Sequence, residues 1–153
     1  IYAVPQGLGG LIDDSFSDTP GMLDFFSDWF GVPYAWPKYA QVAAYDFGGG
    51  MENVSATILG ASSLTDRREG PRNMASLNAH ELGHQWFGDL VTCKSWGHAW
   101  LNESWATYAQ MAYFRHARGE QAYLRELADA TAQYLAETRR YKRPIATDRY
   151  PDG

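Results

Sequence analysis

The apolar positions in the first half of the chain predict one helix set among short strands. Apolar residues recur at helical spacing after Thr19, with Pro20 at the first helical position, and the stripe ends at Phe30. Thr19 is therefore the expected N-cap, and Gly31 stands where a helix commonly stops. Short apolar runs predict strands at residues 1–4, 41–45 and 56–59. The polar or glycine-rich stretches 7–10, 13–18 and 65–72 are expected to be loops.

The second half of the chain predicts helices. Residues 75–87 carry an apolar and histidine pattern at offsets of three and four. Two longer stretches, 101–116 and 119–141, are rich in good helix formers, and Pro144 is expected to end the second one. Because the predicted strands come first and the helices follow, the fold class expected for the chain is α+β.

Composition places the chain among globular proteins. Its 153 residues are 45% hydrophobic and 15% aromatic, enough for the core of one domain. The net charge of −5 and the lack of a basic patch make nucleic acid an unexpected partner. No uncharged apolar run approaches the ~18 residues of a membrane span, so no membrane segment is expected. The single cysteine, Cys93, excludes an internal disulfide and is expected to be a buried small hydrophobe.

The sequence from His80 to His84 is the pattern H-E-x-x-H on a predicted helix. Residues four apart leave the same helix face about 6 Å apart along the axis, so both imidazoles can bind one ion. Glu81 lies about 100° further round, which puts it beside the ion, where a general base for water belongs. His98 and His116 have no such partner and are expected to be ordinary surface or packing residues.

A catalytic zinc site needs a third protein ligand. The sequence excludes an extension to a third histidine, because Phe87 and Leu90 occupy the positions that it would need. Of the downstream carboxylates, Asp89 follows His84 by five residues and is expected to point away from the histidine face. Glu103 follows His84 with eighteen residues between them, on the next predicted helix. A helix–loop–helix hairpin can return Glu103 to the pair, which would complete a two-His, one-Glu set.

Three motifs in this order resemble the zinc aminopeptidases of family M1, which are gluzincins. They are Gly-Gly-Met-Glu-Asn at 49–53, the H-E-x-x-H motif with Gln-Trp-Phe-Gly-Asp after it, and Trp-Leu-Asn-Glu-Ser at 100–104. The likeness runs from residue 1 to at least residue 113. It implies that residues 1–153 are part of a thermolysin-like zinc peptidase catalytic domain. The N-terminal β domain and the C-terminal helical domain of the family are expected to be absent from this sequence.

The resemblance also implies a function and roles for single residues. It implies a zinc-dependent aminopeptidase that removes the first residue of peptides with a free N-terminus, by attack of metal-activated water. His80, His84 and Glu103 would bind one Zn²⁺ per chain, and Glu81 would be the general base. Glu52 would bind the α-ammonium group of the substrate. The segment that would hold the substrate, with its backbone pairing like an added strand, comprises Gly49, Gly50, Met51, Glu52 and Asn53.

The resemblance is incomplete at three points. The tyrosine that helps the family to hold the oxyanion would fall beyond residue 153. The role is not transferred to four tyrosines of this sequence that do not sit in that motif, Tyr108, Tyr113, Tyr141 and Tyr150. Gly50 replaces a more common Ala, and Asp89 replaces a common Asn. Two alternatives therefore stay open: a metal-stabilised interaction module without activity, and a gluzincin with an added hydrolase activity such as epoxide opening.

Overall fold

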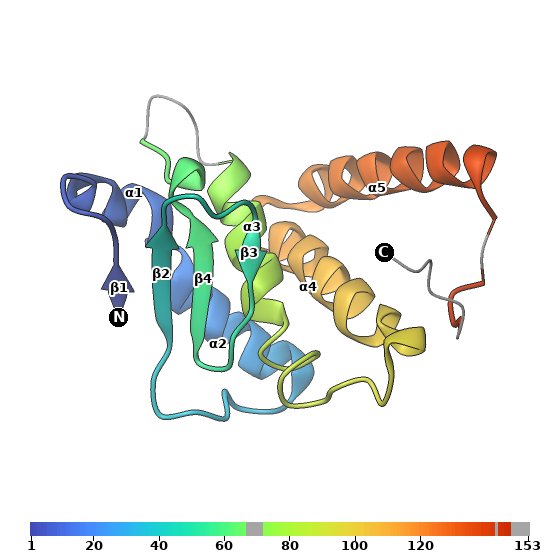
Figure 1. Ribbon diagram of the computed structural model, residues 1–153, viewed down its shortest axis with the longest axis horizontal. Coiled ribbons are helices and arrows are strands. Elements are labelled where there is room, and N and C mark those ends of the chain that lie inside the picture. Colours follow the sequence, from blue (N-terminus) through green and yellow to red (C-terminus); the bar gives the residue numbers. More distant parts are fainter. Residues whose placement is uncertain (67–71, 143, 148–153) are drawn as a thin grey trace.

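The computed structural model describes residues 1–66, 72–142 and 144–147, which form a sheet and a set of helices (Figure 1). Within this part, four strands make one sheet in the order β1-β2-β4-β3. The strands are β1 (Tyr2–Ala3), β2 (Ala40–Ala44), β3 (Gly50–Met51) and β4 (Ala56–Gly60). β1 runs parallel to β2, and β2 parallel to β4, whereas β3 is antiparallel to β4. The short β3 is therefore one of the two edge strands of this sheet, and β1 is the other.

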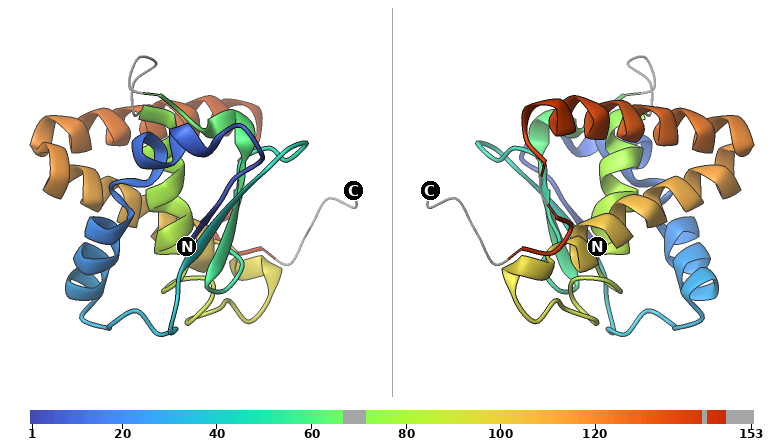
Figure 2. Two further views of the ribbon diagram at one scale, coloured as in Figure 1. Left: turned by 90° about the vertical axis from the view of Figure 1, so that its left-hand side faces the viewer. Right: turned by 90° about the vertical axis from the view of Figure 1, so that its right-hand side faces the viewer.

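The helices lie together on one side of the sheet (Figures 1 and 2). α3 packs against α2, α4 and the edge strand β3, and α5 packs against α4. α4 and α5 form a hairpin that opens toward the start of α4 and the end of α5 (Figure 1). The α-helices are α1 (Ile12–Phe16), α2 (Thr19–Phe30), α3 (Arg72–Gly83), α4 (Trp100–Arg118) and α5 (Glu120–Arg140). Short 3-10 turns occupy Gly9–Leu11, Ala61–Ser63 and Trp96–His98. No helix in the described ranges is both long and apolar enough to cross a bilayer.

Two apolar clusters hold α3 in place. One cluster joins α2, α3 and α4 through buried side chains that include Phe26, Leu82 and Phe114. The other joins the sheet to α1 and α3 through residues that include Leu59 and Met74. Because α3 contributes to both clusters, packing fixes its position between the sheet and α4. Side chains that project from its remaining face are therefore held at defined places.

A closed polar triad ties α3 to the sheet close to His80. The Thr19 hydroxyl donates to Gln41 Oε1, Gln41 Nε2 donates to Asn78 Oδ1, and Asn78 Nδ2 donates to Thr19 Oγ1. All three side chains are buried, so the triad satisfies polar groups that would otherwise be costly. This contact also corrects a prediction: Asp18 is the N-cap residue of α2, and the Thr19 side chain serves the core instead.

The structure confirms the mixed α/β fold expected from the sequence, with corrections in detail. β2 and β4 lie within one residue of the predicted strands. The loop predicted at 13–18 is wrong, because α1 covers most of it and turns Phe16 into the core. Most of the loop predicted at 65–72 lies outside the described residues, and Arg72 begins α3. Cys93 is half-buried rather than buried.

Candidate metal centre

His80 and His84 lie at the C-terminal end of α3 and face each other. Their Nε2 atoms are 3.1 Å apart. The helix was predicted to reach residue 87, but it ends at Gly83, and the chain tightens into i→i−3 bonds at Gln85 and Trp86. The His84 N–H still donates to the His80 carbonyl at 3.2 Å. The i, i+4 relation that the sequence predicted is therefore kept.

Glu103 joins this pair from the first turn of α4. Its Oε2 atom is 3.4 Å from His80 Nε2 and 3.6 Å from His84 Nε2. The three side chains offer ligand atoms that all lie within 4.8 Å of one another. The structure thus brings together the three residues that the sequence proposed as ligands. Two imidazole nitrogens and one carboxylate oxygen are a donor set that suits zinc.

The second nitrogen of His84 has its own partner. Nδ1 lies 3.0 Å from the Phe87 carbonyl oxygen, which can only accept a hydrogen bond. A proton on Nδ1 leaves the lone pair of Nε2 free to face Glu103 and His80. Gly88 packs against the same ring, where a Cβ atom would come 3.0 Å from Nδ1. The ring is therefore held in one orientation by a turn that includes a glycine.

Glu81 extends from α3, and its side chain is buried against Gly50 of the edge strand β3, next to the ligand atoms. Among the described residues, its Oε2 is the buried side-chain oxygen without a hydrogen-bond partner. Burial raises the pKa of Glu81 to about 7, although the nearby His80 and His84 lower it. A Cβ atom on Gly50 would overlap the Glu81 carboxylate, so the missing side chain of Gly50 makes room for it. An unsatisfied carboxylate oxygen beside three ligand atoms fits a site that receives a proton or a cation.

The glycine-rich segment at 49–53 reaches the same site. Glu52 Oε1 is 3.9 Å from His84 Nδ1, and Glu52, Glu81 and His84 form a second group of close ligand atoms. Of the five predicted binding residues, Glu52 thus lies against His84 and Gly50 against the Glu81 carboxylate, whereas Met51 and Asn53 are exposed.

The histidines and carboxylates of the centre shift one another's pKa values. Hydrogen bonds from His80 and His84 hold the pKa of Glu103 well below its usual range. Burial alone would lower the pKa of His84, but the hydrogen bond to Glu103 and the charges of Glu52 and Glu103 raise it in net. Three carboxylates, those of Glu52, Glu81 and Glu103, thus lie close to the two imidazoles. A divalent cation bound at this point would offset their negative charge.

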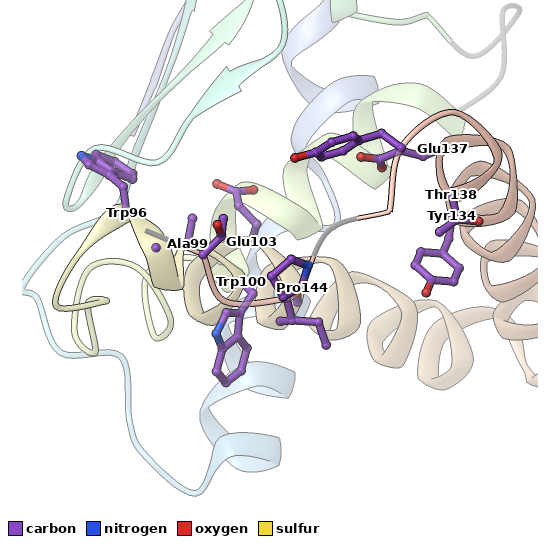
Figure 3. A pocket seen from close by; sticks show the side chains of 13 residues that line it. Trp96, Ala99, Trp100, Glu103, Tyr134, Glu137, Thr138 and Pro144 are labelled. Atoms are coloured by element: carbon purple, nitrogen blue, oxygen red, sulfur yellow. The ribbon is translucent and has the colours of Figure 1, made fainter. Parts of the chain in front are cut away.

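A cavity of about 900 Å³ adjoins the centre, and Glu103 stands on its wall (Figure 3). It lies in the opening of the α4–α5 hairpin, where residues 144–147 pass close to the start of α4. The aromatic and aliphatic side chains on its wall include Trp96, Trp100, Tyr134, Tyr141 and Ile145. No sequence pattern predicts this cavity, because its walls come from segments whose approach depends on the angle between two helices.

The other candidate residues lie apart from the ligand atoms. His116 stacks on Phe25 with ring centroids 4.7 Å apart, which confirms a packing role, and His98 is exposed. Asp89 accepts a hydrogen bond from the buried Gln85 and is not among the ligand groups found in the described residues. Gln85 itself contacts residues 52 and 55, and the sequence predicted no role for it beyond its place in the motif that resembles the family. Of the four tyrosines set aside above, Tyr150 lies outside the described residues.

Comparisons with known proteins agree with this geometry. The profile of the "Peptidase family M1 domain" matches residues 15–150. The chain is 44% identical over 91 residues to the Tricorn protease-interacting factor F2 of Thermoplasma acidophilum, covering 56% of this chain and 12% of that protein. It is 37% identical over 116 residues to the endoplasmic reticulum aminopeptidase 1 of Mus musculus, covering 72% of this chain and 12% of that protein. The chain thus spans about an eighth of the length of these relatives.

A solved structure matches along nearly the whole chain. It is a mutant M1 zinc metallopeptidase from Deinococcus radiodurans, bound to a Tyr-Ser-Ala substrate. The match has a TM-score of 0.68 and 28% sequence identity, and it covers 97% of this chain and 30% of the other. The arrangement of the sheet and helices around the ligand atoms therefore has a counterpart in a known metallopeptidase.

Proposed function

The chain belongs to peptidase family M1, and from this premise we propose that it is part of the catalytic domain of a zinc-dependent aminopeptidase. The proposed reaction removes the N-terminal residue of a peptide by attack of water on the first peptide bond. The main support for the proposal is that the ligand atoms of His80, His84 and Glu103 lie within 4.8 Å of one another, with Glu81 and Glu52 directly beside them.

His80, His84 and Glu103 would hold the zinc ion. Their nitrogen and oxygen atoms form the donor set of a catalytic site, and the solvent-exposed side of Glu103 leaves room for further ligands. When bound there, zinc supplies Lewis acidity, which makes water more acidic and stabilises negative charge on a carbonyl oxygen. The Phe87 carbonyl would keep His84 in the tautomer that this binding needs.

Glu81 would move the proton. It is next to His80 in the chain, its Oε2 has no hydrogen-bond partner, and its carboxylate lies within 4.8 Å of ligand atoms of His84 and Glu52. A carboxylate in this position can take a proton from the attacking water and pass it to the leaving amine. Burial raises the pKa of Glu81 to about 7. At this pKa the carboxylate can hold a proton for part of the catalytic cycle.

Glu52 would select the free amino group. A substrate ammonium near the buried histidines needs a carboxylate partner, because a buried unpaired charge is costly. The Glu52 carboxylate lies 3.9 Å from His84. It can therefore bind the substrate ammonium while the first peptide bond of that substrate lies at the ligand atoms. The edge strand β3 offers backbone groups to which a peptide can add as a further strand. Together these contacts would restrict cleavage to the first peptide bond.

The test compares a free with a blocked N-terminus. Hydrolysis of an aminoacyl anilide and of its N-acetylated form is measured in the complete protein that carries this chain, together with bound zinc. The proposal predicts about one zinc per chain and hydrolysis of the free-amine substrate alone. Equal hydrolysis of both substrates would contradict an aminopeptidase, and zinc without any hydrolysis would favour an inactive metal-stabilised module.

A further inference from the structure

A buried amide links the metal-binding turn to the segment that carries Glu52. Gln85 directly follows His84 and is fully buried. Its Nε2 donates to the Glu52 carbonyl oxygen at 2.8 Å, and its Oε1 accepts from the Ser55 N–H at 2.9 Å. The same Nε2 donates to Asp89 Oδ2 at 2.7 Å. One side chain therefore bridges two points of the β3–β4 connection and a carboxylate beyond α3.

These partners allow the amide a single orientation. The Ser55 N–H can only donate and the Glu52 carbonyl can only accept, so each end of the Gln85 amide has a chemically fixed neighbour. The Tyr34 hydroxyl, whose single proton is shared with the Lys38 carbonyl oxygen at 3.0 Å, lies 3.3 Å from Oε1 and gives weaker support to the same orientation. A carboxylate could keep the contacts with Ser55 and Tyr34, but it could not donate to Glu52. The amide group itself is thus required by the geometry.

The segment that Gln85 holds is conformationally strained. Ser55 has a φ of 60°, in the left-handed region that residues other than glycine seldom adopt. Such a conformation persists where the surroundings over-determine it. The Ser55 carbonyl accepts from the Ala40 N–H and from Lys38 Nζ, both at 2.9 Å, and its N–H is held by Gln85. Without Gln85, one of the restraints on this turn is lost.

We propose that Gln85 is a positioning residue that fixes the Glu52 carboxylate relative to the histidine pair and so enforces the requirement for a free substrate amine. The inference rests on the proposed function and names the element that sets its selectivity. Because His84 and Gln85 are neighbours in one turn, the turn supplies a metal ligand and holds the backbone of the amine-binding residue. A shift of that backbone changes the distance between the substrate amine and the peptide bond to be cleaved.

The test uses Gln85→Glu in the complete zinc-loaded protein that carries this chain. This substitution keeps the size of the side chain and its acceptor contacts, but removes the donors to Glu52 and Asp89. The expected result is a rise of about tenfold in KM for an aminoacyl anilide, the effect of one lost hydrogen bond, with a smaller change in kcat and unchanged zinc content. The preference for the free over the N-acetylated substrate falls by a similar factor. Faster hydrogen exchange of the amides in residues 49–56 is expected in parallel.

A matched control is Gln110→Glu. Like Gln85, Gln110 donates from Nε2 to two acceptors, one of them a carboxylate: these are the Ser76 hydroxyl and Glu126, and Gln110 lies on α4 rather than beside Glu52. This variant loses the same kind of contacts and is expected to keep the wild-type KM and substrate preference. If both variants change KM alike, the effect is a general loss of stability and the proposal for Gln85 is overturned.

A double variant separates the lost contact from charge repulsion. In Gln85→Glu/Asp89→Asn the two like charges no longer face each other, but the Glu52 carbonyl still lacks its donor. The melting temperature is expected to recover while KM stays raised, and recovery of both would overturn the proposal. A wild-type protein without preference for free amines refutes the proposed function and this inference with it. A wild-type preference that Gln85→Glu leaves intact refutes the role of Gln85 alone.

Discussion

Glu81 and Glu103 flank the same two imidazoles in opposite surroundings. Glu81 is buried with one unpaired oxygen, and burial raises its pKa to about 7. Glu103 is exposed on one side, and its hydrogen bonds to the two histidines hold its pKa well below the usual range. A carboxylate that stays ionised suits a metal ligand, whereas one that can hold a proton suits proton transfer. Their surroundings therefore support different proposed roles for two residues of one type.

The role of Glu81 predicts the effect of Glu81→Gln. The amide keeps the shape of the side chain but can no longer accept a proton from water. Hydrolysis is expected to fall by at least about 10²-fold, while zinc binding stays at the wild-type level. Turnover of an aminoacyl anilide and metal content by mass spectrometry check both statements. Near-normal turnover would remove Glu81 from the role of general base.

The role of Glu52 predicts a selective defect in Glu52→Gln. The Glu52 carbonyl, which accepts from Gln85, is unchanged, so the segment stays in place and only the side-chain charge is lost. KM for free-amine substrates is expected to rise about tenfold or more, because a charged pair with the ammonium is lost. Zinc content is expected to stay unchanged. An equal loss of zinc would mean that Glu52 serves the metal rather than the substrate.

The geometry within single helices and strands could be predicted from the sequence, whereas contacts between elements were harder to predict. The convergence of His80 and His84 follows from helix periodicity, which is why it holds although α3 ends before His84. Glu103 reaches the two histidines only if α3 and α4 form a hairpin. The eighteen residues between His84 and Glu103 allow such a hairpin but do not require it. The place of Glu52 came from the family resemblance alone. The Gln85 contacts depend on how the β3–β4 connection docks on α3, which no local pattern records.

The short elements were missed for a related reason. α1 has five residues and β3 has two, too few for a hydrophobic period to show. β3 exists because Gly50 and Met51 pair with β4, and the Gly60 N–H donates to the Gly49 carbonyl at 2.9 Å. Pairing partners, rather than intrinsic preference, define this strand.

The close packing at this edge predicts that Gly60→Ala is destabilising. A Cβ atom on Gly60 would collide with the Phe47 carbonyl oxygen, which is backbone and cannot rotate away. The free energy of unfolding is expected to fall by about 1–3 kcal/mol, as for other overpacked sites. Chemical denaturation measures this change. The control Gly21→Ala lies in α2, where nothing stands within 4 Å of the new Cβ, and is expected to stabilise by about 0.5–1 kcal/mol.

At the scale of the whole molecule, the proposed ligands join two helices. His80 lies in the last turn of α3 and His84 directly follows that helix, whereas Glu103 lies in the first turn of α4. A metal bound by all three would cross-link the helix pair that also forms part of the main apolar cluster. The proposed metal site therefore couples catalysis to the stability of the fold.

This coupling predicts that metal removal lowers the melting temperature. Zinc at 100 times its dissociation constant would stabilise the folded state by about 2.7 kcal/mol, and a chelator would remove that contribution. Calorimetry with chelator and after return of zinc measures the difference. The control variant His84→Ala is expected to show a melting temperature that no longer responds to chelator. A wild-type protein with no response would mean that no metal is bound across α3 and α4.

The proposed function depends on one zinc ion held by His80, His84 and Glu103. The most direct measurement is the X-ray absorption spectrum of the zinc-loaded protein and of its His84→Ala variant. We predict nitrogen and oxygen neighbours at about 2.0–2.1 Å, two of them imidazoles, with zinc largely lost from the variant. A sulfur neighbour at about 2.3 Å, or an unchanged spectrum in His84→Ala, would contradict the claim.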